Sequence, residues 1–373
     1  MASEVLKKGG EVTSEVWGET RGFDFEGMRF GMKAWRASAS DAGEGDAPAV
    51  PIVLVHGFAQ QASTWNDAVR LLAGAGAECF GFELAGHGAG ACSAGGDPAE
   101  RPDFFDLCFQ ARALLAFCRV VARDAGVAPV LVGYSMGGRV ALQAACLAAD
   151  DLRDGGELNR ISLRSSAAFA PCDRARRLDV AGACQQDVTA NAARMSAAVP
   201  FSALVLESAG LGPADDAARE ALRERNFAWA ARVRDEGVSA FMDWWAGLPL
   251  FESQRNLDDD QRERLRAGRL ANDAESLALS FEQAGAHQMP LRCESIRALC
   301  ELSRRGVPVS YLAGRLDAKY CEVLANLRAD SQGAVSCRVV PAAGHNIHLE
   351  QSEAFNAILE EVVESCTPKP AAP

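Results

Sequence analysis

One serine stands in a pattern that can make its hydroxyl group a nucleophile or a base. The segment 133–137 reads GYSMG, which has the form G-x-S-x-G, and it directly follows the apolar run 129–133. A helix is expected to begin at Gly137, so the serine lies at a sharp strand-to-helix turn that the glycines permit. Such a turn lifts the hydroxyl above the sheet edge, where the helix dipole favours developing negative charge. We therefore predict that Ser135 is a catalytic residue.

A serine hydroxyl needs a histidine to accept its proton, and the histidine needs a carboxylate to orient it. With the serine on such a turn, the expected order along the chain is serine, acid, histidine. Asp317 follows the expected strand 307–313, and His345 follows the expected strand 336–340. Both lie at the C-terminal ends of late strands, where parallel sheets place their ligands. The order predicts a triad of Ser135, Asp317 and His345.

Two of these assignments have rivals. Taken alone, Asp317 is more simply explained as the cap of a helix that begins at Ala318. Glu207, at the end of the preceding expected strand, is an alternative acid. His348 lies three residues past His345, and we expect it to begin the final helix with its side chain in solvent.

Backbone N–H groups beside the serine would stabilise negative charge on a reacting oxygen. The sequence His56-Gly57-Phe58 follows the first buried apolar run, where the second half of such an oxyanion hole is built. We predict that the donors are the N–H groups of Phe58 and Met136. His56 itself is expected to bond the loop and not to act on a substrate.

Strand and helix patterns alternate along most of the chain, which is typical of an α/β protein with a parallel, doubly wound sheet. Short apolar runs predict strands buried on both faces. The expected strands lie within 51–58, 78–83, 129–133, 203–207, 307–313 and 336–340. The expected helices between and after them lie at about 104–122, 137–149, 318–329 and 353–363.

The same patterns divide the chain into regions. Residues 1–49 form an N-terminal segment with an expected β-hairpin at 23–37, where apolar and polar residues alternate about a glycine. The core is expected at 50–212 and 291–366, and 150–202 breaks its rhythm as an insertion. The long, helical and tryptophan-containing stretch 213–290 predicts a cap between two core strands.

Composition limits the function classes. The chain has 373 residues, 49% of them hydrophobic, which allows a large core. Without an apolar membrane-length run or an N-terminal signal core, we expect a cytoplasmic protein that does not enter a membrane. The formal net charge of -12 argues against binding to nucleic acid or to an anionic membrane surface. It does not exclude an anionic small molecule, because a few arginines can reverse the field inside a pocket.

No cofactor is expected, since the sequence has no phosphate-binding loop and no dinucleotide-binding glycine pattern. No metal is expected either, because no cluster of metal ligands is visible. The 12 cysteines include no C-x-x-C pair and are expected to be reduced thiols. The sequence leaves the oligomeric state open.

Five motifs, HGF, LAGHG, GYSMGGR, DWWAGLPLF and AAGHN, follow one another along the chain. Together they resemble the family of 2-succinyl-6-hydroxy-2,4-cyclohexadiene-1-carboxylate synthases of menaquinone biosynthesis. The resemblance covers about residues 50–149 and 203–355, and it implies the α/β-hydrolase fold with a helical cap between late core strands. Glu83 and Ala85 stand where family members usually have Asp and Pro, which should alter loop stiffness more than chemistry.

The resemblance also implies residues that bind the family's substrate, a small-molecule polycarboxylate. Arg139 matches the family's substrate-binding arginine and Arg269 its second arginine, while Arg223 is the candidate for a third, in a register that can slip by one residue. The matched aromatic residues are Tyr134, Trp245 and Phe251. Without the resemblance, Arg139 would be taken for an exposed helix residue and the cap aromatics for packing between cap and core.

The reaction that the resemblance implies is a lyase step, in which a proton leaves the ring and pyruvate is eliminated. Ser135, activated by His345, would then act as a base, and Asp317 would orient His345. A serine hydrolase that cleaves an ester, a thioester or a carbon–carbon bond is the alternative, because fold and triad alone do not determine the reaction. A non-catalytic binding protein is a third hypothesis, against which the complete triad argues.

Overall fold

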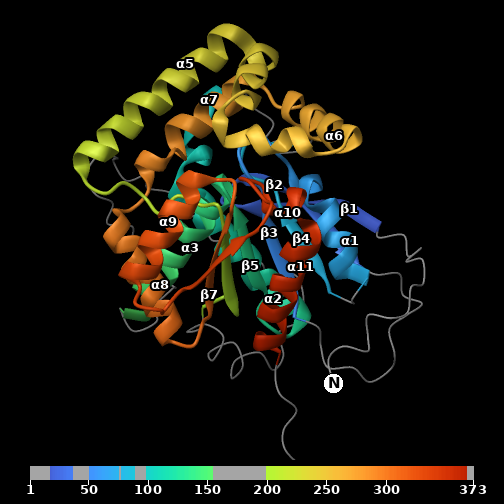
Figure 1. Ribbon diagram of the computed structural model, residues 1–373, viewed down its shortest axis with the longest axis vertical. Helices are drawn as coiled ribbons and strands as arrows, with labels where there is room; N and C mark the ends of the chain where they lie inside the picture. Colours follow the sequence, from blue (N-terminus) through green and yellow to red (C-terminus); the bar gives the residue numbers. More distant parts are fainter. Residues whose placement is uncertain (1–16, 37–49, 75–76, 89–97, 154–198, 368–373) are drawn as a thin grey trace, which may run out of the picture.

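The computed structural model describes residues 17–36, 50–74, 77–88, 98–153 and 199–367 (Figure 1). Among these residues, eight strands form one sheet in the order β1-β2-β4-β3-β5-β6-β7-β8. The strands are β1 (Trp17–Phe25), β2 (Met28–Arg36), β3 (Ile52–Val55), β4 (Cys79–Phe82), β5 (Val130–Tyr134), β6 (Ala203–Glu207), β7 (Val309–Gly314) and β8 (Ser336–Val340). From β4 to β8 all neighbouring strands are parallel, which agrees with the expected doubly wound sheet.

The central strands are buried on both faces. Every residue of β3, β5, β6 and β7 is buried, which explains why their sequences are nearly uninterrupted apolar runs. Because these strands are parallel, their carboxyl ends lie at the same edge of the sheet. The segments that carry Ser135, Asp317 and His345 follow β5, β7 and β8, so the sheet brings them to one edge.

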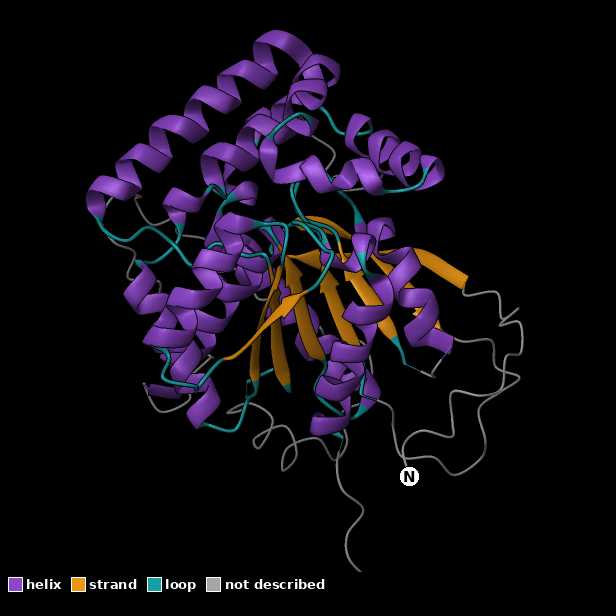
Figure 2. Ribbon diagram, viewed as in Figure 1, coloured by secondary structure: helices purple, strands orange, loops and turns teal. Residues whose placement is uncertain are grey.

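Helices cover both faces of the sheet (Figure 2). One face packs against α1 (Asn66–Gly74) and α11 (Ser352–Cys366). The other packs against α2 (Leu107–Ala125), α3 (Met136–Arg153), α8 (Arg292–Arg304) and α9 (Ala318–Asp330). The sheet therefore separates two apolar cores.

The hairpin β1–β2 extends the sheet at one edge. Its strands pair antiparallel from Trp17 opposite Arg36 to Phe25 opposite Met28, and β2 then pairs antiparallel with β4. Glu26 and Gly27 at the turn both have positive φ, of 44° and 84°. Two-residue hairpin turns need this conformation so that the turn matches the right-handed twist of the strands. The strands begin before the expected residue 23, and the remainder of the predicted segment 1–49 lies outside the described residues.

A group of helices covers the carboxyl edge of the sheet, and Figure 2 shows the strand arrows pointing towards it. It consists of α5 (Asp216–Ala246), a 3₁₀ segment (Pro249–Asn256), α6 (Asp259–Leu270) and α7 (Ala274–Gln283). Gly237 interrupts α5 with φ 76° and ψ 166°. Phe58 from the core packs on Phe281 of α7 with ring centroids 4.3 Å apart. These helices occupy the stretch 213–290 that the sequence predicts as a cap.

Among the described residues, no helix combines the length and the apolar character needed to span a membrane.

Two boundaries differ from the sequence prediction. α2 begins at Leu107 and not near residue 104, because Pro102–Phe105 forms a 3₁₀ turn and the Asp106 side chain caps the helix by accepting the N–H of Phe109. α3 continues to Arg153, four residues into the predicted insertion 150–202. Of that insertion, residues 154–198 lie outside the described residues.

The turn between β5 and α3 is tightly packed. A Cβ atom at Gly137 would collide with the carbonyl oxygens of Val55 and His56 at the end of β3. A Cβ at Gly133 would lie 2.7 Å from the Gly137 carbonyl oxygen. The motif therefore needs these glycines for close approach, while the left-handed backbone belongs to Ser135, whose φ is 50°.

We expect Gly137→Ala to destabilise the fold by about 1–3 kcal/mol, because the new methyl group meets backbone that cannot move aside. The urea concentration at the unfolding midpoint should fall without a change in the slope of the transition. Gly268→Ala is the matched control, since its Cβ would lie 3.4 Å from Gln61 Nε2, an ordinary contact, in the interior of α6. Alanine there should stabilise the protein by up to about 1 kcal/mol. If Gly268→Ala lowered the free energy of unfolding as much as Gly137→Ala, the packing argument would be contradicted.

Candidate active site

The backbone of Ser135 is fixed from both sides. Its N–H donates to the carbonyl oxygen of Glu207 on β6 (2.9 Å), and its carbonyl accepts the N–H of Arg139 in the first turn of α3 (3.1 Å). A non-glycine residue in the left-handed region is strained and persists only where its surroundings hold it. The sheet and the helix together supply that hold, so the direction of the serine hydroxyl is set.

Ser135, His345 and Asp317 form a continuous line of hydrogen bonds. His345 Nε2 lies 3.0 Å from Ser135 Oγ, and His345 Nδ1 lies 2.7 Å from Asp317 Oδ2. A carboxylate only accepts, so Nδ1 carries the hydrogen and Nε2 presents its lone pair to the serine hydroxyl. His345 is 1% exposed and Asp317 5%, which keeps water from competing for this contact. The structure thus brings together the three residues of the predicted triad.

Asp317 also acts as the helix cap that the sequence left as an alternative. Its Oδ1 accepts the N–H of Tyr320 in the first turn of α9 (3.1 Å) while Oδ2 faces His345. Each oxygen therefore has its own partner, and the two interpretations of this residue hold together. Capping fixes the carboxylate in the orientation that His345 needs.

Glu207, the rival acid, binds the histidine loop beyond His345. Its Oε1 accepts the N–H groups of Ile347 (2.6 Å) and His348 (3.1 Å), and its Oε2 lies 2.8 Å from His348 Nδ1. The expectation that His348 is solvated is wrong, because its side chain is buried and its ring stacks on Trp65 with centroids 3.7 Å apart. Glu207 therefore fixes the loop and does not take the place of Asp317.

A second carboxylate, which the sequence analysis missed, holds the loop on the near side of His345. Glu350 Oε2 accepts the N–H of Gly344 (2.7 Å), and Oε1 accepts the N–H of Asn346 (3.1 Å). Burial raises the pKa of Glu350, against the opposing effects of a hydrogen bond from Ser253 in the cap and of these two N–H groups. The residues directly before and after His345 are thus bonded to one side chain.

The two predicted oxyanion donors come from two separate segments near the serine. Met136 is the first residue of α3, where a helix leaves its N–H groups without an intrahelical acceptor. Phe58 follows β3 and lines the same cavity as Ser135. This arrangement agrees with the expected location of the hole, and the function of both N–H groups stays a prediction.

The cavity beside Ser135 has a cationic lining, to which Arg139, Arg225, Arg269 and Lys319 contribute. Among the described residues, none with a carboxylate side chain lines it. The Nε atoms of the three arginines are buried and have no hydrogen-bond partner in the described part of the chain. Burial lowers the pKa of Arg139 and of Arg269 to about 10, since desolvation penalises the charged form. The cavity therefore holds donors that an anion could satisfy.

Arg223 does not belong to this group. Its side chain is 48% exposed and pairs with Glu220, one helical turn away on the surface of α5. Arg225, two residues further on, lines the cavity and is half-buried. Two residues along a helix differ by about 200° in direction, so the two arginines face opposite ways. The prediction for Arg223 is therefore wrong in its location, and Arg225 is the arginine of α5 that lines the cavity.

Aromatic side chains form the remaining walls. Tyr134, Trp245 and Phe251, all predicted, line the cavity together with Phe58, Trp229 and Phe281. Trp245 lies 5.1 Å from Phe58 and 5.7 Å from Phe251 between ring centroids, so it joins the cap to the core. Phe251 also packs edge-on against His345 at 5.7 Å. The cap aromatics thus both line the cavity and pack the cap.

No cluster of His, Cys, Asp or Glu within the described ranges is arranged to bind a metal ion.

The model of the alpha/beta hydrolase family matches residues 52–358, and the chain belongs to this family. Within it, the chain is similar to 2-succinyl-6-hydroxy-2,4-cyclohexadiene-1-carboxylate synthases. It is 28% identical to that of Escherichia coli O81 over 319 residues, which are 85% of this chain and 95% of the relative. It is 30% identical to that of Escherichia fergusonii over 235 residues, 62% of this chain and 67% of the relative. These relatives confirm the resemblance that the motifs indicated.

Solved structures show the same fold. MenH from S. aureus aligns with a TM-score of 0.64 and 21% identity, covering 90% of this chain and 99% of the other. A thermophilic esterase from Thermogutta terrifontis, with malate bound, aligns with a TM-score of 0.57 and 18% identity over 94% of this chain and 100% of the other. The predicted α/β-hydrolase fold is thus confirmed, and the named relatives support an enzyme.

A buried histidine near the cavity gives the protein a built-in sensitivity to acid. His87 is fully buried, and its Nδ1 donates to the carbonyl oxygen of Ala85 (2.8 Å). Desolvation, with a smaller effect of nearby His56, lowers the pKa of His87 to about 3. The folded protein therefore keeps His87 neutral at a pH where the unfolded chain takes up a proton.

Since the folded pKa lies below the ordinary value of 6.5, the stability due to neutral His87 is present above pH 6.5 and is lost as the pH falls towards 3. We expect His87→Asn, which keeps a donor for Ala85, to remove about 2 kcal/mol of the stability loss between pH 7 and pH 5. Urea unfolding at pH 7, 6 and 5 measures this. Parallel pH profiles for the variant and the wild type would show that His87 is not the responsible group.

Proposed function

We propose that this protein is a lyase that eliminates pyruvate from 2-succinyl-5-enolpyruvyl-6-hydroxy-3-cyclohexene-1-carboxylate to give 2-succinyl-6-hydroxy-2,4-cyclohexadiene-1-carboxylate, a step of menaquinone biosynthesis. The observation that carries the proposal is the set of unpartnered buried donors on Arg139, Arg225 and Arg269 around Ser135. A pocket of this charge in a chain of net charge -12 favours an anionic ligand over a neutral ester.

The charges of this substrate match the cavity. Its succinyl, ring and enolpyruvyl groups each carry a carboxylate, and a guanidinium group binds a carboxylate through two parallel hydrogen bonds. Three arginines line the cavity, so each carboxylate can have its own. Binding also offsets the desolvation of the three Nε–H groups, which have no other partner among the described residues. The aromatic walls suit the ring that carries these groups.

The triad supplies the proton transfer. His345 Nε2 accepts the hydrogen of Ser135, and the serine oxygen removes the proton from the ring carbon that bears the succinyl group. The electrons of that C–H bond form a ring double bond, the existing double bond shifts, and the C–O bond breaks. The enolate of pyruvate leaves, and the proton held by His345, or one from water, converts it to pyruvate. Negative charge that builds up on the succinyl keto oxygen is stabilised by the N–H groups of Phe58 and Met136. No covalent intermediate forms on Ser135.

A serine hydrolase is the second candidate. The distance of 3.0 Å between Ser135 Oγ and His345 Nε2 suits nucleophilic attack as well as base catalysis. The esterase among the similar structures shares the fold, although at 18% identity. The two functions differ in one respect that can be measured, since hydrolysis passes through an acyl group on Ser135 and elimination does not.

The first test follows pyruvate release from the enolpyruvyl substrate, generated in situ. We expect the wild-type protein to release pyruvate without a burst, and Ser135→Ala to reduce kcat by about 10²–10⁴-fold because the proton acceptor is gone. Simple esters such as p-nitrophenyl acetate are the comparison. Absence of pyruvate together with rapid ester hydrolysis and a burst would exclude the lyase and favour the hydrolase.

The second test compares two arginines on one helix. Arg225→Ala should raise KM by about 10–100-fold, because a charged hydrogen bond to a carboxylate is worth about 1.5–3 kcal/mol. Arg223→Ala removes the same charge from an exposed position and should leave KM within about twofold. The pair separates local binding from the general loss of one positive charge. Equal KM values for the two variants would contradict the corrected assignment.

A further inference from the structure

The loop after β3 turns sharply at the peptide that carries the Phe58 N–H group. The carbonyl oxygen of Gly57 belongs to that same peptide, and it accepts two hydrogen bonds, from the N–H of Gln60 (3.2 Å) and from His56 Nδ1 (2.8 Å). Ala59 follows with a left-handed φ of 56°. Since the peptide group is planar, whatever fixes the Gly57 carbonyl also fixes the direction of the Phe58 N–H.

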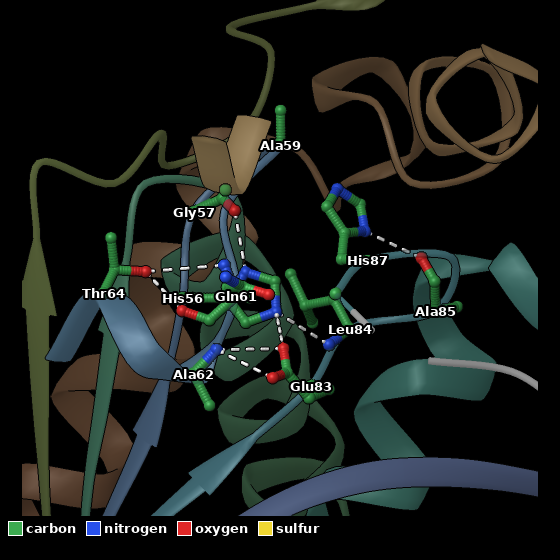
Figure 3. Close-up of polar contacts among 12 residues, drawn as sticks. His56, Gly57, Ala59, Gln61, Ala62, Thr64, Glu83, Leu84, Ala85 and His87 are labelled. Carbon is green, nitrogen blue, oxygen red and sulfur yellow. Dashed lines mark hydrogen bonds and ion pairs between the residues drawn. The ribbon is translucent and has the colours of Figure 1, made fainter. Parts of the chain in front are cut away.

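His56 is held in turn by a carboxylate. The histidine is fully buried, and its Nε2 lies 3.0 Å from Glu83 Oε2 and 3.0 Å from the N–H of Leu84 (Figure 3). The carbonyl of Gly57 can only accept, so Nδ1 must carry a hydrogen. In the neutral ring, Nε2 accepts the N–H of Leu84, and in the protonated ring Nε2 donates to the Glu83 carboxylate. In either form the far side of the ring has a partner, and Nδ1 points at the Gly57 carbonyl.

Glu83 also closes the other end of the same loop. Both of its oxygens accept the N–H of Ala62, at 2.9 and 3.0 Å, where the 3₁₀ turn Ala62–Trp65 begins. One side chain from the end of β4 therefore binds the loop 56–62 at both of its ends (Figure 3). Only 15% of that side chain is exposed, so water competes weakly for these bonds.

We propose that Glu83 and His56 are positioning residues that aim and polarise the Phe58 N–H group toward the oxygen that becomes negative during the reaction. The inference rests on the oxyanion function proposed for Phe58. Gln60 alone satisfies the Gly57 carbonyl, so the His56 bond is not needed to avoid an unpaired acceptor. Its effect is to hold the peptide in one orientation and, because hydrogen bonds in a chain strengthen one another, to make the N–H a better donor.

Glu83 reaches both targets because of its length. An aspartate is one methylene shorter, so its carboxylate would lose contact with either His56 Nε2 or the Ala62 N–H. The Glu that departs from the family pattern is therefore matched to this loop and, in our proposal, sets the position of a catalytic N–H. Neither residue lines the cavity, so neither touches a substrate.

The test uses a reaction that needs the oxyanion donors but not the physiological substrate. With a fluorophosphonate probe, Ser135 Oγ forms a bond to phosphorus, fluoride leaves as the P–F bond breaks, and the serine proton passes to His345. Charge builds on the phosphoryl oxygen, where the Phe58 N–H would act. The second-order rate of labelling thus reports on the hole even if the lyase proposal fails, and His345→Ala shows which labelling depends on the triad.

Two substitutions of His56 form a matched pair. Asparagine places its amide nitrogen where Nδ1 was and keeps the donor to Gly57, whereas leucine fills a similar volume without a donor. We expect H56L to slow labelling by about 10–100-fold and H56N by less than about threefold, since removing one oxyanion donor outright costs about 10²–10³-fold. In the pyruvate assay kcat should fall in the same order with KM unchanged. H56L that labels at the wild-type rate, or H56N that loses as much as H56L, overturns the proposal.

Glu83 provides a second pair if leucine at position 56 prevents folding. Glutamine can accept the Ala62 N–H and donate to His56 Nε2, whereas alanine can do neither. We expect E83A to slow labelling about tenfold and E83Q to keep most of the rate. If E83A and E83Q lost the labelling rate equally, and each loss followed only the fall in the unfolding midpoint, Glu83 would have a structural role alone. That result would overturn the proposal. Wild-type protein that releases no pyruvate but shows the expected labelling order would reject the lyase function and support the positioning role.

Discussion

The close contact between the start of α3 and the carbonyl end of β3 determines the geometry of the whole site. Gly137 lies against the carbonyl oxygens of Val55 and His56 with no space for a side chain. The contact lies two residues after Ser135, whose backbone is left-handed with φ 50° and whose hydroxyl lies 3.0 Å from His345 Nε2. It also sets the distance between the serine and the loop after β3, which carries Phe58. The sheet order, the turn at Ser135 and the loop after β3 are thus parts of one packing arrangement.

The loops that carry His345 and Phe58 are held by charged groups that do not line the cavity. Glu207 and Glu350 accept hydrogen bonds from backbone N–H groups of the loop that contains His345. Glu83 accepts one from the loop after β3. A carboxylate that accepts several N–H bonds is strongly directional, which suits a loop with no regular structure of its own. The arginines of the cavity differ, since each has an Nε–H group with no hydrogen-bond partner in the described part of the chain.

The sequence predicted what depends on local pattern. The strand at 203–207 follows from an apolar run and is confirmed. The triad follows from the order of three residues, and the structure brings their side chains within hydrogen-bond distance. Arg223 was the predicted third arginine, but Arg225 lines the cavity, because the resemblance left the register open and a helical pattern does not give the rotation of the helix against the core. His348 was expected in solvent because its partner Glu207 is distant in sequence. Glu350 ends the short helix Ile347–Glu350, and its contacts with Gly344 and Asn346 depend on how that helix lies against the preceding loop. The periodicity of apolar residues in the sequence does not predict such a contact.

Asp317 joins two tasks that most proteins give to separate residues. One oxygen begins α9 and the other orients His345, so the start of a helix and the basicity of the site depend on one side chain. Evolution cannot adjust either task here without changing the other. Asparagine would still cap the helix but would present an amide to the histidine, and glutamate would shift both contacts at once. A substitution at this position therefore disturbs a helix start and a histidine contact together.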